Sequence, residues 1–493
     1  TYLFIHIFIY KKIMTQQMDT DYPTGGSKLS TAKKIAIGVV VVALAVLLIL
    51  LCVFLIPRNN DDKHTGPLNV IVFIPDGFGP SGATLARVMK NVTTNGGSLS
   101  LNFDPFLVGT VRTRSASSLV TDSAAAASAY STGYKTINDA LGVDAAMRPL
   151  GTMFEAAKTK GMKTGLVVTT RISDATPSAF YAHSATRENE AFIISQWANR
   201  GINVALGGGK KYFNSTILEQ AANNYTIVFD KESMANVTKG NILGLFARKD
   251  MPYEIDRVND PQYSHLPSLA EMTTKALELI SQNNDKGFIL LVEGSKIDLA
   301  GHDNDAFTHW RETLAFDSAF QVGLDFAKKD KNTVIVMMAD HETGGLTLGF
   351  QPDLKTYPDY LWIPELLTMT TASATAMTAE ISAMNKTTNA TVITGYINTT
   401  ELLVHFYGIE DWWSLAQFIG RYMSERAWVG FTTGGHTGSD INLYNHYTGS
   451  DDNVEEQMLH GNYDNTDIAR YLESILHLDL AAETAKLVNT PVK

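Results

Sequence analysis

Cysteine is nearly absent from this sequence. Among 493 residues there is one, Cys52, and it lies within a long apolar segment near the N-terminus. The remainder of the chain can therefore form no internal disulfide and can offer no thiolate to a metal ion. Any metal site in it must be built from histidine, aspartate, glutamate or hydroxyl side chains.

Basic residues are outnumbered by acidic ones. Lys and Arg total 40 against 51 Asp and Glu, which gives a formal net charge of -11 and a pI near 5.6. Nucleic-acid backbones favour basic surfaces, so this composition argues against a nucleic-acid-binding protein. With 45% hydrophobic and 18% charged residues, the chain is globular and long enough for one large or two ordinary domains.

Residues 35–56 contain no charged side chain at all. At about 1.5 Å per residue, such a segment reaches across a hydrocarbon layer of about 30 Å, so it predicts a transmembrane helix. A buried core helix would show a polar face, which this segment lacks. A cleaved signal peptide fits less well, because the segment is long and no small-residue cleavage site follows it. Residues 1–34 then form a cytosolic tail and residues 57–68 a linker.

Lysines gather on the N-terminal side of this segment. Lys11, Lys12, Lys28, Lys33 and Lys34 precede it, whereas Arg58 and Lys63 are the only basic residues close behind it. The positive-inside rule predicts a single-pass type II protein, held by a signal anchor, whose large domain is lumenal, as in a vacuole, or extracellular. Residues 1–13 lack an initiator Met and are expected to be spurious, with Met14 or Met18 as the true start.

Seven glycosylation sequons lie beyond the predicted span and agree with a lumenal glycoprotein. They are Asn91, Asn214, Asn224, Asn236, Asn385, Asn389 and Asn398.

Residues 69–493 alternate strand-like apolar runs with helix-like segments. The apolar runs are residues 69–77, 164–170, 202–209, 287–295 and 333–341, and the helical patterns are residues 271–282 and 309–329. This alternation predicts an α/β fold with a large, mostly parallel central sheet and helices on both faces. Between about 351 and 428 the pattern changes, which predicts an inserted, crown-like subdomain over the catalytic face. No internal repeat is apparent.

Acids and histidines follow several of these predicted strands. They are Asp76, Asp174, Glu293, Asp340 and His341. In open α/β sheets the ligand crevice lies outside the carboxyl ends of the strands, so side chains far apart in sequence can meet there.

The segment TDSAAAASAYSTG places Ser123 at the start of an alanine-rich run with high helix propensity. A helix N-terminus favours anionic groups such as phosphate. The simpler alternative is that Ser123 is an N-cap, whose hydroxyl accepts one unpaired backbone N–H. As a nucleophile it would need activation, and no G-x-S-x-G elbow surrounds it, so metal coordination is the remaining route.

The spacing of histidines and carboxylates predicts two zinc ions. Asp298 and His302 are four positions apart, which places both side chains on one helical face or in one tight loop. Asp340 and His341 end an apolar strand and are positioned to bind a second ion. Two zinc ions about 4 Å apart suit an in-line phosphoryl transfer.

These segments resemble the signature set of the alkaline phosphatase family, in the same order along the chain. The segments are PDGFGP, TDSAAAASAYSTGYKT, SDATPSAFYAHSATR, VEGSKIDLAGH, ADHETGG and GGHTGSD. The resemblance implies a metal-dependent phosphate monoester hydrolase that works through a phosphoserine at Ser123, with Arg187 binding the substrate phosphate. It also implies two Zn²⁺ ions, one Mg²⁺ ion and a homodimer that acts on small phosphate monoesters, with phosphopeptides as further candidates.

The resemblance also assigns residues to each metal ion. The first zinc ion would be bound by Asp298, His302 and His436, and the second by Asp340 and His341. Magnesium would be bound by Thr176 and Glu293, with Asp174 in its surrounding shell. Asp76 would bridge a zinc ion and magnesium.

Two positions depart from the family pattern. Leu299 stands where the family usually has His or Lys, so a positive or hydrogen-bonding group near the phosphate is missing, which bears on phosphate affinity and pH optimum. Asp174 follows the bacterial pattern, whereas the mammalian enzymes carry His. A membrane span before a cysteine-free domain is most similar to the vacuolar alkaline phosphatases of fungi.

Two other functions are open on the sequence. One is a phosphodiesterase or sulfatase on the same scaffold, although the sulfatase signature C/S-x-P-x-R is absent at Ser123 and a two-metal diesterase would not need Thr176 and Glu293. The other is a membrane-tethered binding or adhesion protein, which the full set of proposed ligands argues against. Zinc analysis with a chromogenic phosphate monoester would separate them.

Overall fold

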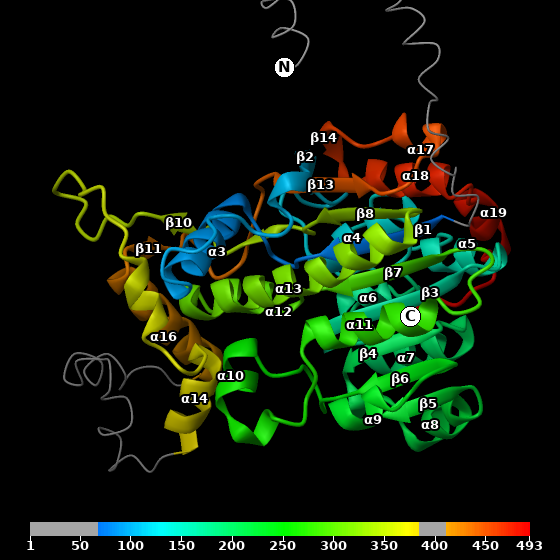
Figure 1. Ribbon diagram of the computed structural model, residues 1–493, viewed down its shortest axis with the longest axis horizontal. Helices are drawn as coiled ribbons and strands as arrows, with labels where there is room; N and C mark the ends of the chain where they lie inside the picture. The colour runs from blue at the N-terminus through cyan, green and yellow to red at the C-terminus, as the bar shows by residue number, and fades with distance from the viewer. Residues whose placement is uncertain (1–67, 384–410) are drawn as a thin grey trace, which may run out of the picture. The chain divides into compact units, whose positions relative to one another are not determined.

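The computed structural model describes residues 68–383 and 411–493 (Figure 1). The predicted cytosolic tail, the predicted span at 35–56 and nearly all of the linker lie outside these residues, as do residues 384–410 of the predicted insert. Within the described ranges, no helix combines the length and apolar character needed to cross a membrane. The described residues form one compact unit.

A ten-stranded sheet forms the centre of this unit. Its order is β14-β2-β13-β8-β1-β7-β3-β4-β6-β5, and among the described strands only β13 runs antiparallel to its neighbours, β2 and β8. The strands are β1 (Asn69–Ile74), β2 (Leu107–Arg112), β3 (Lys163–Arg171), β4 (Val204–Gly208), β5 (Tyr225–Val228), β6 (Asn241–Leu245), β7 (Phe288–Glu293), β8 (Thr333–Met338), β13 (Ile441–Tyr447) and β14 (Gly461–Asp464). The mostly parallel α/β architecture predicted from the sequence is confirmed.

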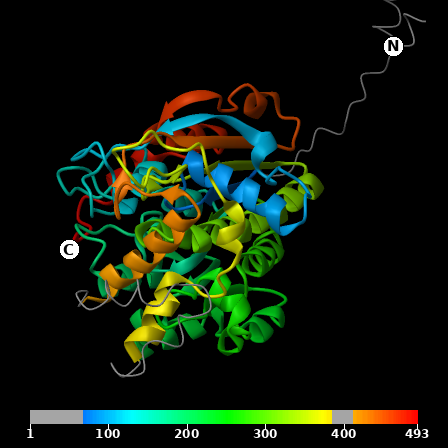
Figure 2. The same ribbon diagram turned by 90° about the vertical axis from the view of Figure 1, so that its left-hand side faces the viewer.

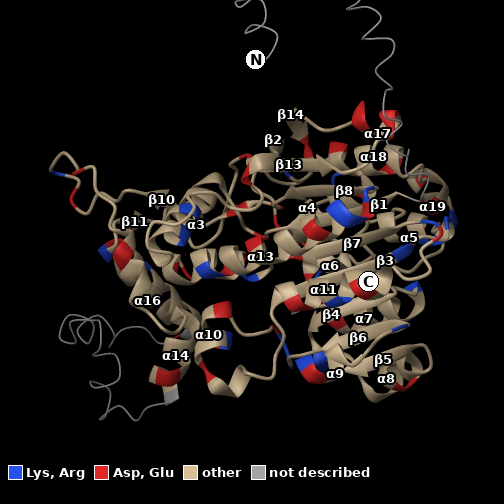
Figure 3. Ribbon diagram, in the orientation of Figure 1, with Lys and Arg blue, Asp and Glu red and all other residues tan. Residues whose placement is uncertain are grey.

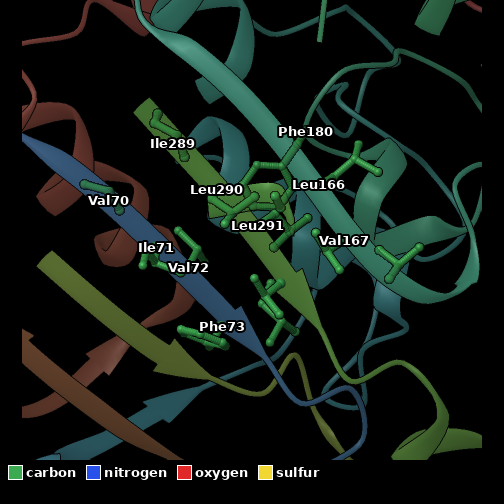
Figure 4. Packing of buried hydrophobic residues seen from close by; sticks show 14 of the residues in the cluster. Val70, Ile71, Val72, Phe73, Leu166, Val167, Phe180, Ile289, Leu290 and Leu291 are labelled. Atoms are coloured by element: carbon green, nitrogen blue, oxygen red, sulfur yellow. The ribbon is translucent and has the colours of Figure 1, made fainter. Parts of the chain in front are cut away.

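The central strands are buried along their whole length. Every residue of β1, β7 and β8 is buried, and Val72 lies beside Leu291 in the parallel register of β1 with β7. Figure 4 shows the β-branched and leucine side chains of β1, β7 and β3 packed beside one another. Strands covered on both faces need continuous apolar runs rather than alternation, which explains why the sequence showed these strands so clearly.

Helices cover the sheet on both faces. On one face α11 (Leu269–Ile280) and α13 (Ala306–Asp330) pack against each other, and on the other lie α4 (Ser123–Thr132), α5 (Met153–Thr159) and α18 (Asn465–Ile475). Gly323 lets α13 approach β1 closely, since a Cβ there would lie 2.7 Å from the ring of Phe73. The two helices predicted at 271–282 and 309–329 therefore exist, with ends that differ by a few residues.

The remaining elements are short. The helices are α6 (Ala175–Ser178), α7 (Glu190–Arg200), α8 (Ser215–Ala222), α9 (Lys231–Ala235), α10 (Glu254–Asn259), α12 (Lys296–His302), α17 (Asp452–Glu455) and α19 (Leu480–Lys486), with 3₁₀ turns η1 (Asp104–Phe106), η2 (Lys210–Tyr212) and η3 (Pro261–Tyr263). Two small ribbons pair β9 (Glu342–Thr343) with β12 (His436–Thr437) and β10 (Thr347–Leu348) with β11 (Val429–Gly430).

The described parts of the predicted insert form a helical lobe. It contains η4 (Pro364–Thr368), α14 (Ala374–Ala383) and α16 (Trp412–Arg426), and it packs on α3 (Pro80–Thr93) and the start of α13. A second hydrophobic cluster holds it, to which α16 contributes Leu415, Ile419 and Met423. Figure 2 looks onto this end of the unit, with the yellow and orange helices α14 and α16 in front.

Charged side chains avoid the central strands. In Figure 3 these strands are largely tan, and acidic and basic residues are mixed over the helices and loops of that view. Polar side chains become frequent where β8, β1, β7 and β3 end. These four adjacent parallel strands therefore deliver their following loops to one edge of the sheet.

Candidate metal centre and active site

A first cluster, made of Asp298, His302 and His436, lies at this edge. Asp298 and His302 belong to α12, directly after β7, whereas His436 comes from β12. One ligand atom from each residue lies within 4.8 Å of the others. The Nε2 atoms of the two histidines are 3.2 Å apart, and His302 Nε2 is 3.2 Å from Asp298 Oδ2.

Backbone carbonyls orient both imidazoles of the first cluster. His302 Nδ1 donates to Gly434 O at 2.7 Å, and His436 Nδ1 donates to Thr121 O at 2.8 Å. With Nδ1–H used in this way, the neutral rings direct Nε2 lone pairs towards Asp298. Such facing lone pairs need a cation between them, which can be a proton or a metal ion.

The electrostatics of the first cluster agree with that requirement. Burial opposes protonation of His302, but the charge of Asp298 outweighs it and raises the pKa of His302 to about 9. Burial, with the neighbouring His341, lowers the pKa of His436 to about 4. The negative charge of Asp298 thus favours a positive charge beside it, which agrees with a cation site formed by these three residues.

A second cluster consists of Asp76, Asp340 and His341, all buried. Its ligand atoms also lie within 4.8 Å of one another. His341 Nε2 is 3.1 Å from Asp340 Oδ2 and 3.7 Å from Asp76 Oδ1. These residues follow β1 and β8, which are neighbours in the sheet, so residues more than 260 positions apart meet directly.

Ser123 lies against the second cluster. Its Oγ is 3.2 Å from His341 Nε2, and the residue is buried. The helix cap is Asp122, whose side chain accepts from Ala125 N at 2.9 Å, so Ser123 is the first residue of α4 and not its N-cap. The capping alternative for Ser123 is therefore wrong, and its hydroxyl is directed at a metal-ligating type of side chain instead.

Several predicted ligand atoms are buried and make no hydrogen bond of good geometry, although Asp340 Oδ2 lies 3.1 Å from His341 Nε2. They are Asp76 Oδ1, Asp340 Oδ2, Glu293 Oε2 and Thr176 Oγ1. Buried polar groups in folded proteins are almost always paired, so these atoms indicate that something else satisfies them. All four are oxygens, which are the ligands that hard divalent cations prefer.

The carboxylates of this region repel one another. Burial and the charges of Asp340 and Asp298 raise the pKa of Asp76 well above its usual range. Burial and the charge of Asp174 do the same for Glu293. In the absence of a cation these acids tend to keep protons, and a bound divalent ion would displace them. The residues present therefore fit metal ions.

Arg187 lies beside Asp122, the residue that caps the Ser123 helix. Its Nη1 is 3.7 Å from Asp122 Oδ2, and its Nη2 is 3.1 Å from Asp174 Oδ1. Burial opposes its charge, but Asp174 and Asp122 outweigh that effect and raise the pKa of Arg187, so it is a permanent cation. A guanidinium in this place can bind an anion held at Ser123.

Thr343, for which no role was predicted, connects the two clusters. Its Oγ1 donates to Asp298 Oδ1 at 2.5 Å and is 3.2 Å from His341 Nδ1. It is buried in β9, two residues after His341, within the ADHETGG segment. Its neighbour Glu342 accepts from Gly345 N at 3.2 Å and from Leu346 N at 3.1 Å, and so fixes the loop.

The helical lobe also contacts the site. Gln417 of α16 donates to His302 O at 3.2 Å. Leu299, in contrast, packs beside Tyr253, Ile255 and Ala300 and brings no polar group. Of the predicted site residues, the structure groups six in the two clusters and places Ser123, Asp174, Arg187, Glu293 and Thr176 around them; their roles stay predictions.

This arrangement, with its sequence motifs, matches known proteins. The family model for alkaline phosphatase covers residues 68–478. The chain belongs to the alkaline phosphatase family. It is 36% identical to the repressible alkaline phosphatase of Saccharomyces cerevisiae over 86% of this chain and 83% of that protein. It is 35% identical to alkaline phosphatase 3 of Bacillus subtilis over 86% of this chain and 91% of that protein.

Solved structures of this family share the fold. A cold-active alkaline phosphatase from the psychrophile Shewanella sp. superposes with a TM-score of 0.73 and 33% identity, covering 83% of this chain and all 100% of that one. A variant of the alkaline phosphatase from the Antarctic bacterium TAB5, described with Mg bound, has a TM-score of 0.60 and 26% identity over 84% of this chain and 99% of that one. The resemblance read from the sequence motifs is confirmed: this protein is an alkaline phosphatase, a phosphoric monoester hydrolase.

We expect Thr343→Val to weaken divalent cation binding about 10-fold or more, because it removes the hydroxyl that orients Asp298 and His341 while keeping the shape of the side chain. The measurement is zinc affinity of the metal-stripped protein by competition with a chelating dye. Thr347→Val, at an exposed position of β10, is the matched control. Equal zinc affinity in the Thr343 variant and the wild type would show that this hydroxyl does not support the ligands.

Proposed function

We propose that the protein hydrolyses phosphate monoesters through a phosphoserine at Ser123, with two Zn²⁺ ions and one Mg²⁺ ion. The observation that carries this proposal is the 3.2 Å contact between Ser123 Oγ and His341 Nε2, at the start of α4 and inside the second cluster. The N-terminus of a helix favours a negatively charged phosphoryl group. A hydroxyl held there among metal-ligating side chains is placed to accept one.

The proposed ligands follow the two clusters. Asp298, His302 and His436 would hold one zinc ion, and Asp340 and His341 the other, since imidazole and carboxylate suit zinc. Asp76 would lie between the second zinc and magnesium, and the unpaired oxygens of Thr176 and Glu293 suit magnesium, with Asp174 in its surroundings. When bound, these ions supply Lewis acidity that lowers the pKa of the serine hydroxyl and stabilises the leaving oxygen.

The chain's own groups perform the remaining tasks. Ser123 Oγ attacks phosphorus in line with the leaving oxygen, and the bond to that oxygen breaks, which leaves phosphoserine and an alcohol. Arg187 binds non-bridging oxygens of the phosphoryl group through its planar guanidinium. Water then cleaves the phosphoserine and releases inorganic phosphate. The described contacts address only the phosphoryl group, which suits a range of small phosphate monoesters, with phosphopeptides included.

Replacing the nucleophile tests the covalent route. We expect Ser123→Ala to lower kcat for p-nitrophenyl phosphate by about three orders of magnitude or more, because no alkoxide can form. Zinc content, measured by elemental analysis, should stay as in the wild type. Ser128→Ala, which changes another buried serine of α4, is the matched control. Full activity of the Ser123 variant would exclude the phosphoserine mechanism.

Removing the metal ions tests the ligand assignment. We expect prolonged chelation to abolish activity, and zinc with magnesium together to restore it, at two zinc ions and one magnesium ion per chain. Cation affinity should fall as pH is lowered, because protons compete for His302 and for the acids Asp76 and Glu293, whose pKa values are raised. Titration calorimetry at several pH values measures this. A metal-free preparation with wild-type activity would contradict the proposal.

We further propose that residues 35–56 anchor the enzyme as a type II membrane protein with its catalytic domain in a vacuole-like lumen or outside the cell. Support comes from the uncharged segment and the lysines before it. The full chain should stay with membranes after alkaline carbonate extraction, and a form starting at residue 64 should be released. Release of the full chain would contradict the anchor. Homodimer formation and glycosylation stay predictions of the sequence.

A further inference from the structure

Arg171, the last residue of β3, has no role in the proposed chemistry, yet it is among the most heavily paired side chains near the site. Its Nη2 lies 3.0 Å from Asp174 Oδ1, its Nε 3.0 Å from Glu190 Oε2, and its Nη1 2.5 Å from Asp250 Oδ1. The three carboxylates come from three different segments, and the Arg171 side chain is only 21% exposed. All three sides of the guanidinium are therefore occupied by anions.

The first of these carboxylates is shared with the phosphate-binding arginine. Asp174 Oδ1 is 3.0 Å from Arg171 Nη2 and 3.1 Å from Arg187 Nη2. The same oxygen accepts from Ala175 N at 2.9 Å, where Asp174 caps α6. The backbone N–H of Ala175 and the guanidinium of Arg171 thus both hold the Asp174 carboxylate in position. This carboxylate in turn orients Arg187.

Loss of Arg171 would change the electrostatic interaction between Asp174 and Arg187. Asp174, Glu190 and Asp250 would then face one another without the cation that now separates them, which disfavours their present positions. Asp174 would keep a single arginine partner, and the charge of Arg187 would be neutralised more completely by it. Position 299 cannot replace the missing cation, because Leu299 packs in an apolar cluster.

We propose that Arg171 is a positioning residue for the phosphate-binding arginine: by sharing Asp174 with Arg187, it fixes that carboxylate and leaves part of the Arg187 charge free for the phosphoryl group. This inference rests on the proposed function, in which Arg187 binds phosphate. It adds a residue that touches neither substrate nor metal and that sets phosphate affinity through one shared carboxylate.

The test is phosphate affinity of the metal-loaded enzyme. Arg171→Gln should raise the dissociation constant of inorganic phosphate, measured by calorimetry, and its inhibition constant about 10-fold, as expected when one charge-assisted contact is lost. KM should rise with them, and kcat should change less. Arg171→Lys keeps the charge but cannot contact three carboxylates with one planar fork, so we expect a rise of about threefold.

Two controls separate positioning from general loosening of this region. Asp250→Asn removes an ion pair from Arg171 on the side away from Asp174, so phosphate affinity should stay within about twofold of wild type. In an Asp174→Asn background, Arg171→Gln should have little further effect, because the shared carboxylate is gone. Equal effects of Arg171→Gln in both backgrounds would overturn the proposal, as would an Asp250 variant that weakens phosphate as much.

Arg187→Ala distinguishes this inference from the proposed function. If Arg187→Ala weakens phosphate binding and neither Arg171 variant does, the inference is wrong and the function stands. If Arg187→Ala leaves phosphate binding unchanged, the role of Arg187 itself is wrong. The lysine variant keeps the test decisive if the glutamine variant does not fold, because unchanged phosphate affinity with lysine would show that the three-way contact is unnecessary.

Discussion

The structure depends on one constraint: four carboxylates of the site, on Asp76, Glu293, Asp298 and Asp340, are buried close together. Like charges in a buried place are unfavourable unless protons or cations neutralise them, and the raised pKa values of Asp76 and Glu293 express this directly. Such a cluster cannot form by its own affinity. The free energy that holds these carboxylates together must come from other parts of the fold. A bound cation would reduce their mutual repulsion and so stabilise the folded state.

The central sheet supplies that energy. Strands β8, β1, β7 and β3 are adjacent, parallel and filled with buried aliphatic side chains, so their ends are fixed relative to one another. The site residues lie at or just beyond the carboxyl ends of these strands: Glu293 is the last residue of β7, Asp76 and Asp340 follow β1 and β8, and Asp174 follows β3. The histidines and Ser123 are then oriented by local contacts, such as the carbonyl of Thr121 on His436 and the Asp122 cap that leaves Ser123 free.

The sequence predicted β1, β3, β4, β7 and β8, which contain runs of buried residues. Strands β1, β7 and β8 are continuous apolar runs, whereas β5 and β14 carry exposed or half-buried residues and were not predicted. Burial alone was not sufficient, because β6 is buried at four of its five positions and was not predicted either. The apolar runs also indicated that side chains following these strands meet at one edge of the sheet, as the two clusters do. The role of Thr343 was not predicted, because it depends on which atoms its hydroxyl faces. The two interpretations of Ser123 predict the same helix, so only the position of its hydroxyl could separate them.

The positive charge at Asp174 comes from Arg171 and Arg187, and position 299 contributes none. Leu299 packs against an apolar cluster next to Asp298, and the two arginines meet at Asp174, just after β3. A cation at position 299 would have acted on a bound phosphate by its own proximity. Arg171 instead would act by fixing the position of the carboxylate that it shares with Arg187. An effect of this kind is sensitive to small displacements of the Asp174 side chain. The proposed role of Arg171 would make phosphate affinity depend on the loop after β3 as well as on the metal clusters.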